Sequence, residues 1–578
     1  MLYKKKFLVF MAAAFAMMIL GCVHAVPPGE HQLKMNCAAL SGMTISKDKI
    51  DLPTNGATIT SAALVPATPQ TVDGSRNIVL AVPEYCKVLG SIAPVDPKAP
   101  LINFEVNLPT EWNQKSMHYG GGGLNGILVT GLDSPFPQPP DSPTPLGRGY
   151  VTIGSDSGHQ GGGNAAFGLN EESLLNFCYE QLKKTKDTAF EIIKAYYGKA
   201  PKYSYFDGNS EGGRESHTVV QRYPKDYDGV IAVAPIISEQ GTHIHDNAML
   251  TAFAPGPVGG GGWMNQNKIK LIADSTNALC DADDGLVDGI ISKYGTLDPD
   301  LGWRAACQHD VSVLRCNGGA DTGETCLSDA QIAAVHVIRD RFVLPFKLPN
   351  GSTGYVSYGA MGGENNLNGW AGPRGPILGP TIPPVPQPPE IMSSAGIGGV
   401  AYFGHTNMRF FVAQDPNFQT YNFDPVPYKS RIEYLSSIID SIDPDISQFT
   451  KRGGKLIMKD NTADYHRSVF LGINYYKSLL DKFGEPTVED SVRLYVAVGA
   501  NHFGENAPSQ ADLITLLENW VEKGIAPPKN IEAVTVDRTN FKVTASRPMC
   551  GYGQYPRYKG SGDPNAASSF FCTGLMGK

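Results

Sequence analysis

Residues 208–212 have the pattern glycine–x–serine–x–glycine, which is typical of a nucleophilic serine. An apolar run at residues 203–206 precedes it, and a helix-like segment at residues 211–222 follows it. In such a strand–turn–helix the glycines leave room for a tight turn that is strained at the serine and exposes its hydroxyl. Backbone N–H groups at the start of the helix can then stabilise an oxyanion. We interpret Ser210 as a nucleophile; the alternative is a glycine-rich turn that closes an ordinary strand.

A serine nucleophile needs a histidine base and an acid that orients this base, and the sequence offers both on loops that follow apolar strands. His502 follows the predicted strand at residues 492–498, and Asp464 follows the one at residues 456–458. Asp460 lies nearer the end of the latter strand and is the rival acid. The order serine, acid, histidine is that of α/β-hydrolases. A solvated loop histidine is the alternative interpretation of His502.

A run of glycines at residues 120–123 follows another predicted strand. Glycines allow the backbone to come close to whatever lies above the end of the strand. In a hydrolase of this type such a loop donates the second N–H group of an oxyanion hole. The alternative is a flexible loop.

An acidic loop at residues 280–290 carries aspartates at short spacings, interrupted by glycines. Carboxylates in this arrangement suit a hard cation such as Ca²⁺, although the spacing is not that of an EF-hand. An acidic surface loop is an equally good interpretation from the residues alone.

The elements around these motifs alternate as in a parallel α/β sheet. Predicted strands at residues 149–154, 203–206 and 229–235 are separated by predicted helices at residues 171–197 and 211–222. Earlier strands, among them residues 78–82 and 102–106, would form an antiparallel first part of the sheet. Further strands at residues 453–458 and 492–498 alternate with helices at residues 468–483 and 511–523.

The alternation breaks between residues 237 and 440, which we interpret as an inserted lid domain that contains the acidic loop. The predicted organisation is therefore a signal at residues 1–25, a first catalytic part at residues 26–236, the lid at residues 237–440, and a second catalytic part at residues 441–578.

The N-terminus has the features of an export signal. Three lysines at residues 4–6 precede an apolar run at residues 7–20 and then Gly21-Cys22. Cleavage after Ala25, lipidation of Cys22 and an anchored helix are the three possible outcomes, and all of them export the protein. No later apolar run is long enough to suggest a membrane span. A net charge of −8, with no basic run beyond the N-terminus, argues against nucleic acid as a partner.

Ten cysteines become nine once Cys22 is set aside, so one thiol should stay unpaired. Cys178 is the natural candidate, because it lies in a predicted helix whereas the others lie near turns. The sequential order would allow the pairs Cys37–Cys86, Cys280–Cys307, Cys316–Cys326 and Cys550–Cys572, although the sequence alone does not determine the pairing.

Taken together, these motifs resemble the tannase and feruloyl esterase family over nearly all of the mature chain. The resemblance rests on residues 120–126, 156–159, 196–198, 208–215, 227–229, 280–290, 453–457, 463–464 and 501–502, and most specifically on the C-terminal residues 547–550 and 558–563. It implies an α/β-hydrolase fold with a large inserted lid, and the cysteine order above is similar to that of the family.

The resemblance also implies residue roles. Ser210 would be the nucleophile, His502 the base and Asp464, rather than Asp460, the acid. The oxyanion hole would be formed by the backbone N–H groups of Glu211 and of the Gly122 and Gly123 region. A structural Ca²⁺ would be held by the side chains of Asp281, Asp284 and Asp288 and by the carbonyl groups of Leu286 and Ile290.

One departure from the family concerns the loops that carry the nucleophile and the base. Family members have a cysteine just before the nucleophile and another just after the base, joined in a disulfide; here Asn209 and Phe503 take these positions. Packing and hydrogen bonds must then hold the two loops together, and a misplacement of about 1 Å can cost a hundredfold in rate.

We predict from these observations an exported serine esterase that works through an acyl-enzyme. The resemblance suggests aromatic acyl esters of feruloyl, galloyl or terephthaloyl type, including plant-derived esters, as substrates. The alternative is a non-catalytic, calcium-stabilised surface protein that binds polyphenols or polysaccharide. An acyltransferase or a peptidase with the same triad is a third hypothesis.

Overall fold

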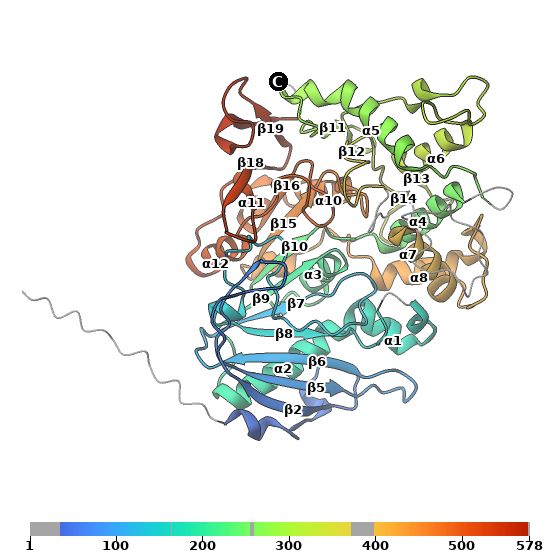
Figure 1. The fold of residues 1–578 in the computed structure, drawn as a ribbon. Helices are drawn as coiled ribbons and strands as arrows, with labels where there is room; N and C mark the ends of the chain where they lie inside the picture. Colours follow the sequence, from blue (N-terminus) through green and yellow to red (C-terminus); the bar gives the residue numbers. More distant parts are fainter. Residues whose placement is uncertain (1–34, 163–164, 255–258, 371–397, 576–578) are drawn as a thin grey trace, which may run out of the picture.

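The computed structural model describes residues 35–162, 165–254, 259–370 and 398–575. Its centre is a 12-stranded sheet in the order β1-β2-β5-β6-β8-β7-β9-β10-β15-β16-β18-β17 (Figure 1). In that order the strands are Thr44–Ile45, Ala57–Val65, Tyr85–Ile92, Ile102–Pro109, Val151–Ser155, Lys115–Tyr119, Tyr203–Asn209, Gly229–Val233, Lys455–Asn461, Val492–Ala497, Val543–Gly551 and Ile531–Val536.

The middle of the sheet is parallel. Strands β8, β7, β9, β10, β15 and β16 run in one direction, whereas the strands added at both edges pair antiparallel. Helices connect the parallel strands as the alternating pattern predicts: α2 (Gln181–Tyr197) leads into β9, α3 (Glu211–Arg222) leads from β9 to β10, and α10 (Val469–Phe483) and α11 (Glu485–Ser491) lie between β15 and β16. The carboxyl ends of the central strands therefore meet at one edge, where ligands bind in folds of this kind.

Successive side chains of the central strands point to opposite faces of the sheet, and each face carries a hydrophobic core. On β10, Val230 and Ala232 face the side that α3 and α10 cover. Ile231 and Val233 face the other side, where they pack with Leu517 of α12 (Leu513–Lys523). These side chains are all at most 1% exposed, which is the apolar continuity expected of a strand buried on both faces.

The predicted helix at residues 171–197 is present, with an interruption. It consists of α1 (Glu171–Leu175), a π-helical turn at Asn176–Glu180, and α2. Gly198 ends it in the left-handed conformation, with φ of 77°, which is the usual place for glycine at a helix end.

The strand predicted at residues 78–82 is present only at its first two residues and does not join the main sheet. The strand there is β4 (Ile78–Val79), which pairs with β3 (Thr71–Val72) outside the main sheet. Val72 and Val79 are 63% and 44% exposed, so the apolar run has no core to pack against. In the main sheet β5, which the sequence analysis did not name, lies between β2 and β6. The strand predicted at residues 102–106 is present as β6.

The segment between β10 and β15 contributes no strand to the main sheet within its described residues. It contains the helices α4 (Glu239–Phe253), α5 (Gln266–Cys280), α6 (Asp329–Arg339), α7 (Gly399–Asn407), α8 (Lys429–Ile439) and α9 (Ser447–Lys451), and the small hairpins β11–β12 (Gly295–Asp298, Gly302–Ala305) and β13–β14 (Phe342–Val343, Gly354–Tyr355). In Figure 1 most of these elements lie together beside the central strands, on the side that also carries α1. This is where the sequence places the lid, although the predicted domain boundaries stay predictions.

The described residues form four disulfides: Cys37–Cys86, Cys280–Cys307, Cys316–Cys326 and Cys550–Cys572. The last bridges β18 and β20 (Phe570–Gly574), which pairs with β19 (Gln554–Tyr558). Cys178 is free and buried, as predicted.

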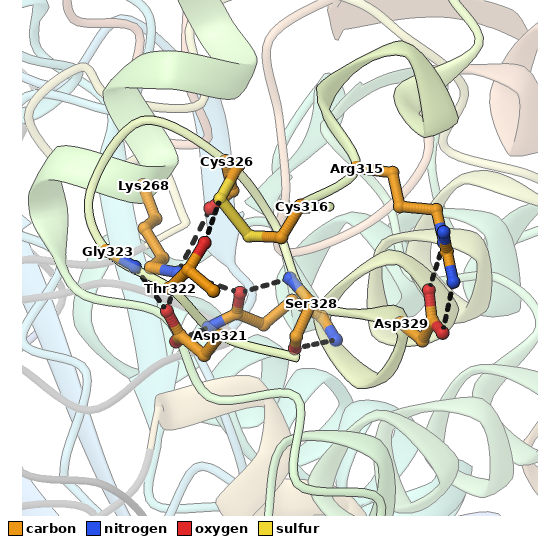
Figure 2. The surroundings of a disulfide bond; sticks show 10 residues. Lys268, Arg315, Cys316, Asp321, Thr322, Gly323, Cys326, Ser328 and Asp329 are labelled. Atoms are coloured by element: carbon orange, nitrogen blue, oxygen red, sulfur yellow. Dashed lines mark hydrogen bonds and ion pairs between the residues drawn. A yellow bond between two sulfur atoms is a disulfide. The ribbon is translucent and has the colours of Figure 1, made fainter. Parts of the chain in front are cut away.

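The Cys316–Cys326 disulfide closes a short loop between α5 and α6, and Figure 2 shows its surroundings. The ammonium of Lys268 on α5 donates to Asp321 at 2.8 Å and to the carbonyl of Cys326 at 3.0 Å. These bonds fix the loop against the helix.

No helix within the described ranges is both long and apolar enough to cross a bilayer. The predicted signal at residues 1–25 lies outside the described residues.

Candidate active site

Ser210 stands in a strained turn between the end of β9 and the start of α3. Its backbone has φ of 63° and ψ of −119°, which a residue other than glycine rarely adopts. A β-carbon at Gly208 would lie 2.0 Å from the carbonyl oxygen of Gly212, so the first glycine of the pattern has no room for a side chain. The glycines thus permit the turn, and the serine bears the strain, as in a nucleophile elbow.

The hydroxyl of Ser210 is hydrogen-bonded to His502, and His502 is hydrogen-bonded to Asp464. The Oγ atom of Ser210 lies 2.9 Å from Nε2 of His502, and Nδ1 of His502 lies 2.8 Å from Oδ2 of Asp464. With the proton on Nδ1, His502 donates to the carboxylate and accepts from the serine. Ser210 is half-buried, whereas Asp464 and His502 are buried. This geometry can deprotonate the hydroxyl.

Asp464, rather than Asp460, is the carboxylate that contacts His502. Its Oδ1 atom accepts the backbone N–H groups of His466 at 2.9 Å and Arg467 at 3.2 Å. Burial acts to raise the pKa of Asp464, but the charge and hydrogen bond of His502, with a contribution from Arg467, hold it below its ordinary value. Asp464 is therefore ionised at neutral pH.

Asp460, the rival acid, has a different partner. It is fully buried and forms an ion pair with the guanidinium of Arg467, which is also fully buried. Burial raises the pKa of Asp460 despite this pairing. Arg467 lies 3.6 Å from Asp464 as well, so Asp460 helps to hold the cation that faces Asp464.

The glycine loop after β7 packs on the first turn of α3. A β-carbon at Gly120 would lie 2.7 Å from the Cα atom of Gly212, so the two segments approach as closely as glycines allow. The N–H group of Gly121 donates to Glu215 on α3 at 2.9 Å, and the side-chain amide of Asn125 donates to the same carboxylate. Glu215 is fully buried, and burial raises its pKa.

This anchorage leaves the next amides available. Within the described chain, the N–H groups of Gly122, Gly123 and Glu211 have no hydrogen-bond acceptor. Gly122 is exposed, Gly123 is half-buried, and Glu211 directly follows Ser210 at the start of α3. These are the donors that the sequence predicts for an oxyanion hole, and their role remains a prediction.

Two aromatic side chains contact the triad in a way that the sequence analysis did not predict. His466 stacks on His502, with ring centroids 4.5 Å apart and planes inclined by 16°. Phe503 meets both imidazoles edge-on, at 5.3 Å from His466 and 5.4 Å from His502. The one available signal was that His466 lies two residues after Asp464 in the same loop.

His466, His502 and Asp464 each bring one potential ligand atom within 4.8 Å of the others, which raises the question of a metal. The nearly parallel imidazole planes make the in-plane lone pairs of the two rings run side by side rather than converge on one point. The ring nitrogens of His502 are also engaged by Ser210 and Asp464. This arrangement suits proton transfer better than tetrahedral metal coordination.

The acidic loop follows α5. Asp281 and Asp284 are 4% and 1% exposed, and the Oδ1 atom of Asp281 is buried without a hydrogen-bond partner among the described residues. Burial and the charge of Asp288 raise the pKa of both carboxyls. Asp288 itself pairs with Arg547 of β18 at 2.5 Å. Buried carboxylates with an unsatisfied oxygen fit a hard cation.

Comparisons with known proteins show what the whole chain is similar to. A family model described as "Tannase and feruloyl esterase" matches residues 86–573. An uncharacterized esterase of Agrobacterium fabrum is 34% identical over 546 residues, covering 93% of this chain and 92% of the relative. Mono(2-hydroxyethyl) terephthalate hydrolase of Piscinibacter sakaiensis is 29% identical over 557 residues, covering 90% and 89%.

Among solved structures, feruloyl esterase B from Aspergillus oryzae superposes with a TM-score of 0.69 at 22% sequence identity. The alignment covers 93% of this chain and 100% of that one. At this identity the likeness shows the fold, which is the α/β-hydrolase fold.

Asp464 and Asp460 have different partners, so we expect their replacement by asparagine to have different effects. We expect Asp464→Asn to lower kcat by about 10⁴-fold, because His502 would lose the acceptor that sets its tautomer. Asp460→Asn should instead lower the free energy of unfolding by about 3–5 kcal/mol, because it leaves the guanidinium of Arg467 buried without its main partner. Ester turnover and urea unfolding of both variants measure this. Equal losses of kcat at unchanged stability would contradict the assignment of the acid.

Proposed function

The chain belongs to the tannase and feruloyl esterase family and is a carboxylic ester hydrolase, and from this premise we propose that it is an exported serine esterase that acts on aromatic acyl esters through an acyl-enzyme. The observation that carries the proposal is the continuous line of hydrogen bonds from Asp464 through His502 to Ser210. A non-catalytic binding protein would have no use for this alignment or for the strained turn.

The geometry performs the reaction in two halves. In the first, the Oγ atom of Ser210 attacks the ester carbonyl while His502 takes the hydroxyl proton on Nε2. The amides of Glu211, Gly122 and Gly123 stabilise the oxyanion, and the C–O bond to the alcohol then breaks as His502 returns the proton to the leaving oxygen. In the second, His502 deprotonates a water molecule that attacks the acyl-enzyme, and the acid leaves as Ser210 regains its proton.

Asp464 keeps its charge throughout. Its lowered pKa means that the carboxylate stays ionised when His502 becomes an imidazolium, so each proton transfer ends in a stabilised ion pair.

An aromatic acyl group is supported by the surroundings of the glycine loop. A β-carbon at Gly123 would lie 3.4 Å from the ring of Phe403, a half-buried residue on α7 of the inserted segment. An aromatic ring beside this glycine loop gives an aromatic acyl group a surface to pack against. The names of the relatives, which include a mono(2-hydroxyethyl) terephthalate hydrolase and several probable feruloyl esterases, point to the same class.

Export is supported by two features of the chain. The N-terminal residues have the pattern of an export signal, and the four disulfides are of a kind that persists in oxidising compartments. The protein is then periplasmic, secreted, or attached to a membrane surface through a lipid on Cys22.

We propose in addition that the acidic loop binds a structural Ca²⁺. The side chains of Asp281, Asp284 and Asp288 and the carbonyls of Leu286 and Ile290 would hold it, and the unsatisfied Oδ1 atom of Asp281 supports this. The ion would neutralise buried carboxylates near the Cys280–Cys307 disulfide and would take no part in ester cleavage.

The purified mature chain should hydrolyse p-nitrophenyl, feruloyl, galloyl or terephthaloyl esters. Ser210→Ala should lower kcat by about 10⁴-fold or more, because no other group can form the acyl-enzyme. Turnover across this panel of esters measures both. The proposal fails if Ser210→Ala retains the activity of the wild type.

Phe403→Ala should lower kcat/KM for feruloyl or terephthaloyl esters by about tenfold while that for p-nitrophenyl acetate changes little, since only the aromatic acyl group loses a packing surface. Tyr402→Ala is the matched control, because this neighbouring ring packs against Leu250 and Ala401 and lies beside the ring of Phe403, at a centroid distance of 6.3 Å, rather than beside Gly123. Equal losses on acetyl and aromatic acyl esters would count against an acyl pocket at Phe403.

Millimolar Ca²⁺ should raise the melting temperature of the chelator-treated wild type by about 2 °C or more, whereas Mg²⁺ should not. This gain should disappear in Asp281→Asn and Asp284→Asn. Asp283→Asn is the matched control, because Asp283 lies in the same loop but is exposed. Identical melting curves of the wild type with and without Ca²⁺ would exclude the site.

A further inference from the structure

The ring of His466 covers one face of His502, and the backbone places it there. Oδ1 of Asp464 accepts the N–H group of His466, while Oδ2 of the same carboxylate accepts Nδ1–H of His502. One carboxylate therefore fixes both residues. Stacking at 4.5 Å with a 16° tilt then brings the imidazoles nearly face to face.

The surroundings of His466 determine its protonation at the pH of catalysis. Burial, and then the proximity of His502, lower the pKa of His466 to about 3, so His466 is neutral at the pH of catalysis. Its Nδ1 atom is buried without a hydrogen-bond partner in the described part of the chain. His466 therefore carries no charge at the pH of catalysis, and what it presents to His502 is a neutral aromatic face.

Phe503 is a third ring that contacts both His466 and His502. The plane of its ring is inclined by more than 80° to both imidazole planes, and its centroid lies 5.3 and 5.4 Å from theirs. Asn209, which precedes Ser210, and Phe503, which follows His502, leave the two loops without a covalent link, so noncovalent contacts must hold the base in place. The aromatic packing of His466 and Phe503 is such a contact.

We propose that His466 is a positioning residue whose aromatic face holds the imidazole of His502 in line with Ser210 and stabilises the imidazolium that forms there during acyl transfer. The attraction between a cation and an aromatic face is appropriate to this geometry, since the charge develops on a ring that lies over another ring. The inference rests on the proposed function, because it needs His502 to act as the base.

Other charged groups near the pair stay constant when His466 is replaced. Asp464 and Arg467 belong to the same loop, with Arg467 3.6 Å from the carboxylate. Asp460 and Lys459 precede them on β15, and both contribute to the charge around Asp464 and Arg467. A change in the titration of His502 on replacement of His466 therefore reports on the stacked ring.

The test is the rate at which a fluorophosphonate labels Ser210, measured from pH 4 to 9 for the wild type, His466→Phe, His466→Leu and His466→Gln. We expect His466→Leu and His466→Gln to react about 3- to 30-fold more slowly at neutral pH, and His466→Phe to stay within about threefold of the wild type. The two variants without a ring should also have the acid limb of their rate profile at lower pH by about half a unit, because the imidazolium loses a stabilising contact.

A melting curve is recorded for the wild type and each variant. If His466→Leu is misfolded, the comparison uses His466→Gln instead. Wild-type rates in both ringless variants would overturn the inference, as would an equal loss in His466→Phe or a loss without movement of the acid limb. If the wild type takes no label at Ser210, the proposed function fails and this inference with it. Labelling of the wild type with equal rates in all variants refutes the inference alone.

Discussion

The hydrogen bond between Nε2 of His502 and Oγ of Ser210 joins residues that are 292 positions apart in the sequence, and the rest of the structure serves to keep it at 2.9 Å. Its two ends sit on loops after β16 and β9, and the acid sits after β15. Because these strands are parallel within one sheet, their carboxyl ends lie at one edge, and the three loops converge there. The large insertion between β10 and β15 does not disturb this convergence, since the two strands still pair along their full register.

Close backbone packing and buried charged groups around Ser210 also restrict how this part of the chain can move. Gly120, Gly208 and Gly212 lie so close together that a side chain on any of them would collide with backbone. The fully buried carboxylate of Glu215 ties the glycine loop to the nucleophile helix, with Arg214 as a neighbouring cation. Such buried polar groups are costly to desolvate and stay in place only when their partners are present, which makes the arrangement rigid.

The parts of this site that depend on local sequence could be predicted, and those that depend on packing could not. The elbow at residues 208–212, the α3 helix and the apolar strands β10, β15 and β16 follow directly from residue pattern. The residues alone left Asp460 and Asp464 as rivals, because the choice between them depends on where Arg467 points. The apolar residues 78–82 have the pattern of a sheet strand but no core to cover them, and His466 is recognisable only once its ring is seen against His502. The helices of the inserted segment were also missed, because glycine- and proline-rich stretches obscured their periodicity.

The most direct test of the central claim is to trap the covalent intermediate. The purified enzyme would be mixed with a p-nitrophenyl ester of an aromatic acid, quenched in acid on the millisecond scale, digested and analysed by mass spectrometry. The account predicts a burst of about one p-nitrophenol per active site and the acyl group on the peptide that contains Ser210. Steady release of the alcohol without a burst, with that peptide unmodified and another nucleophile acylated, would contradict it.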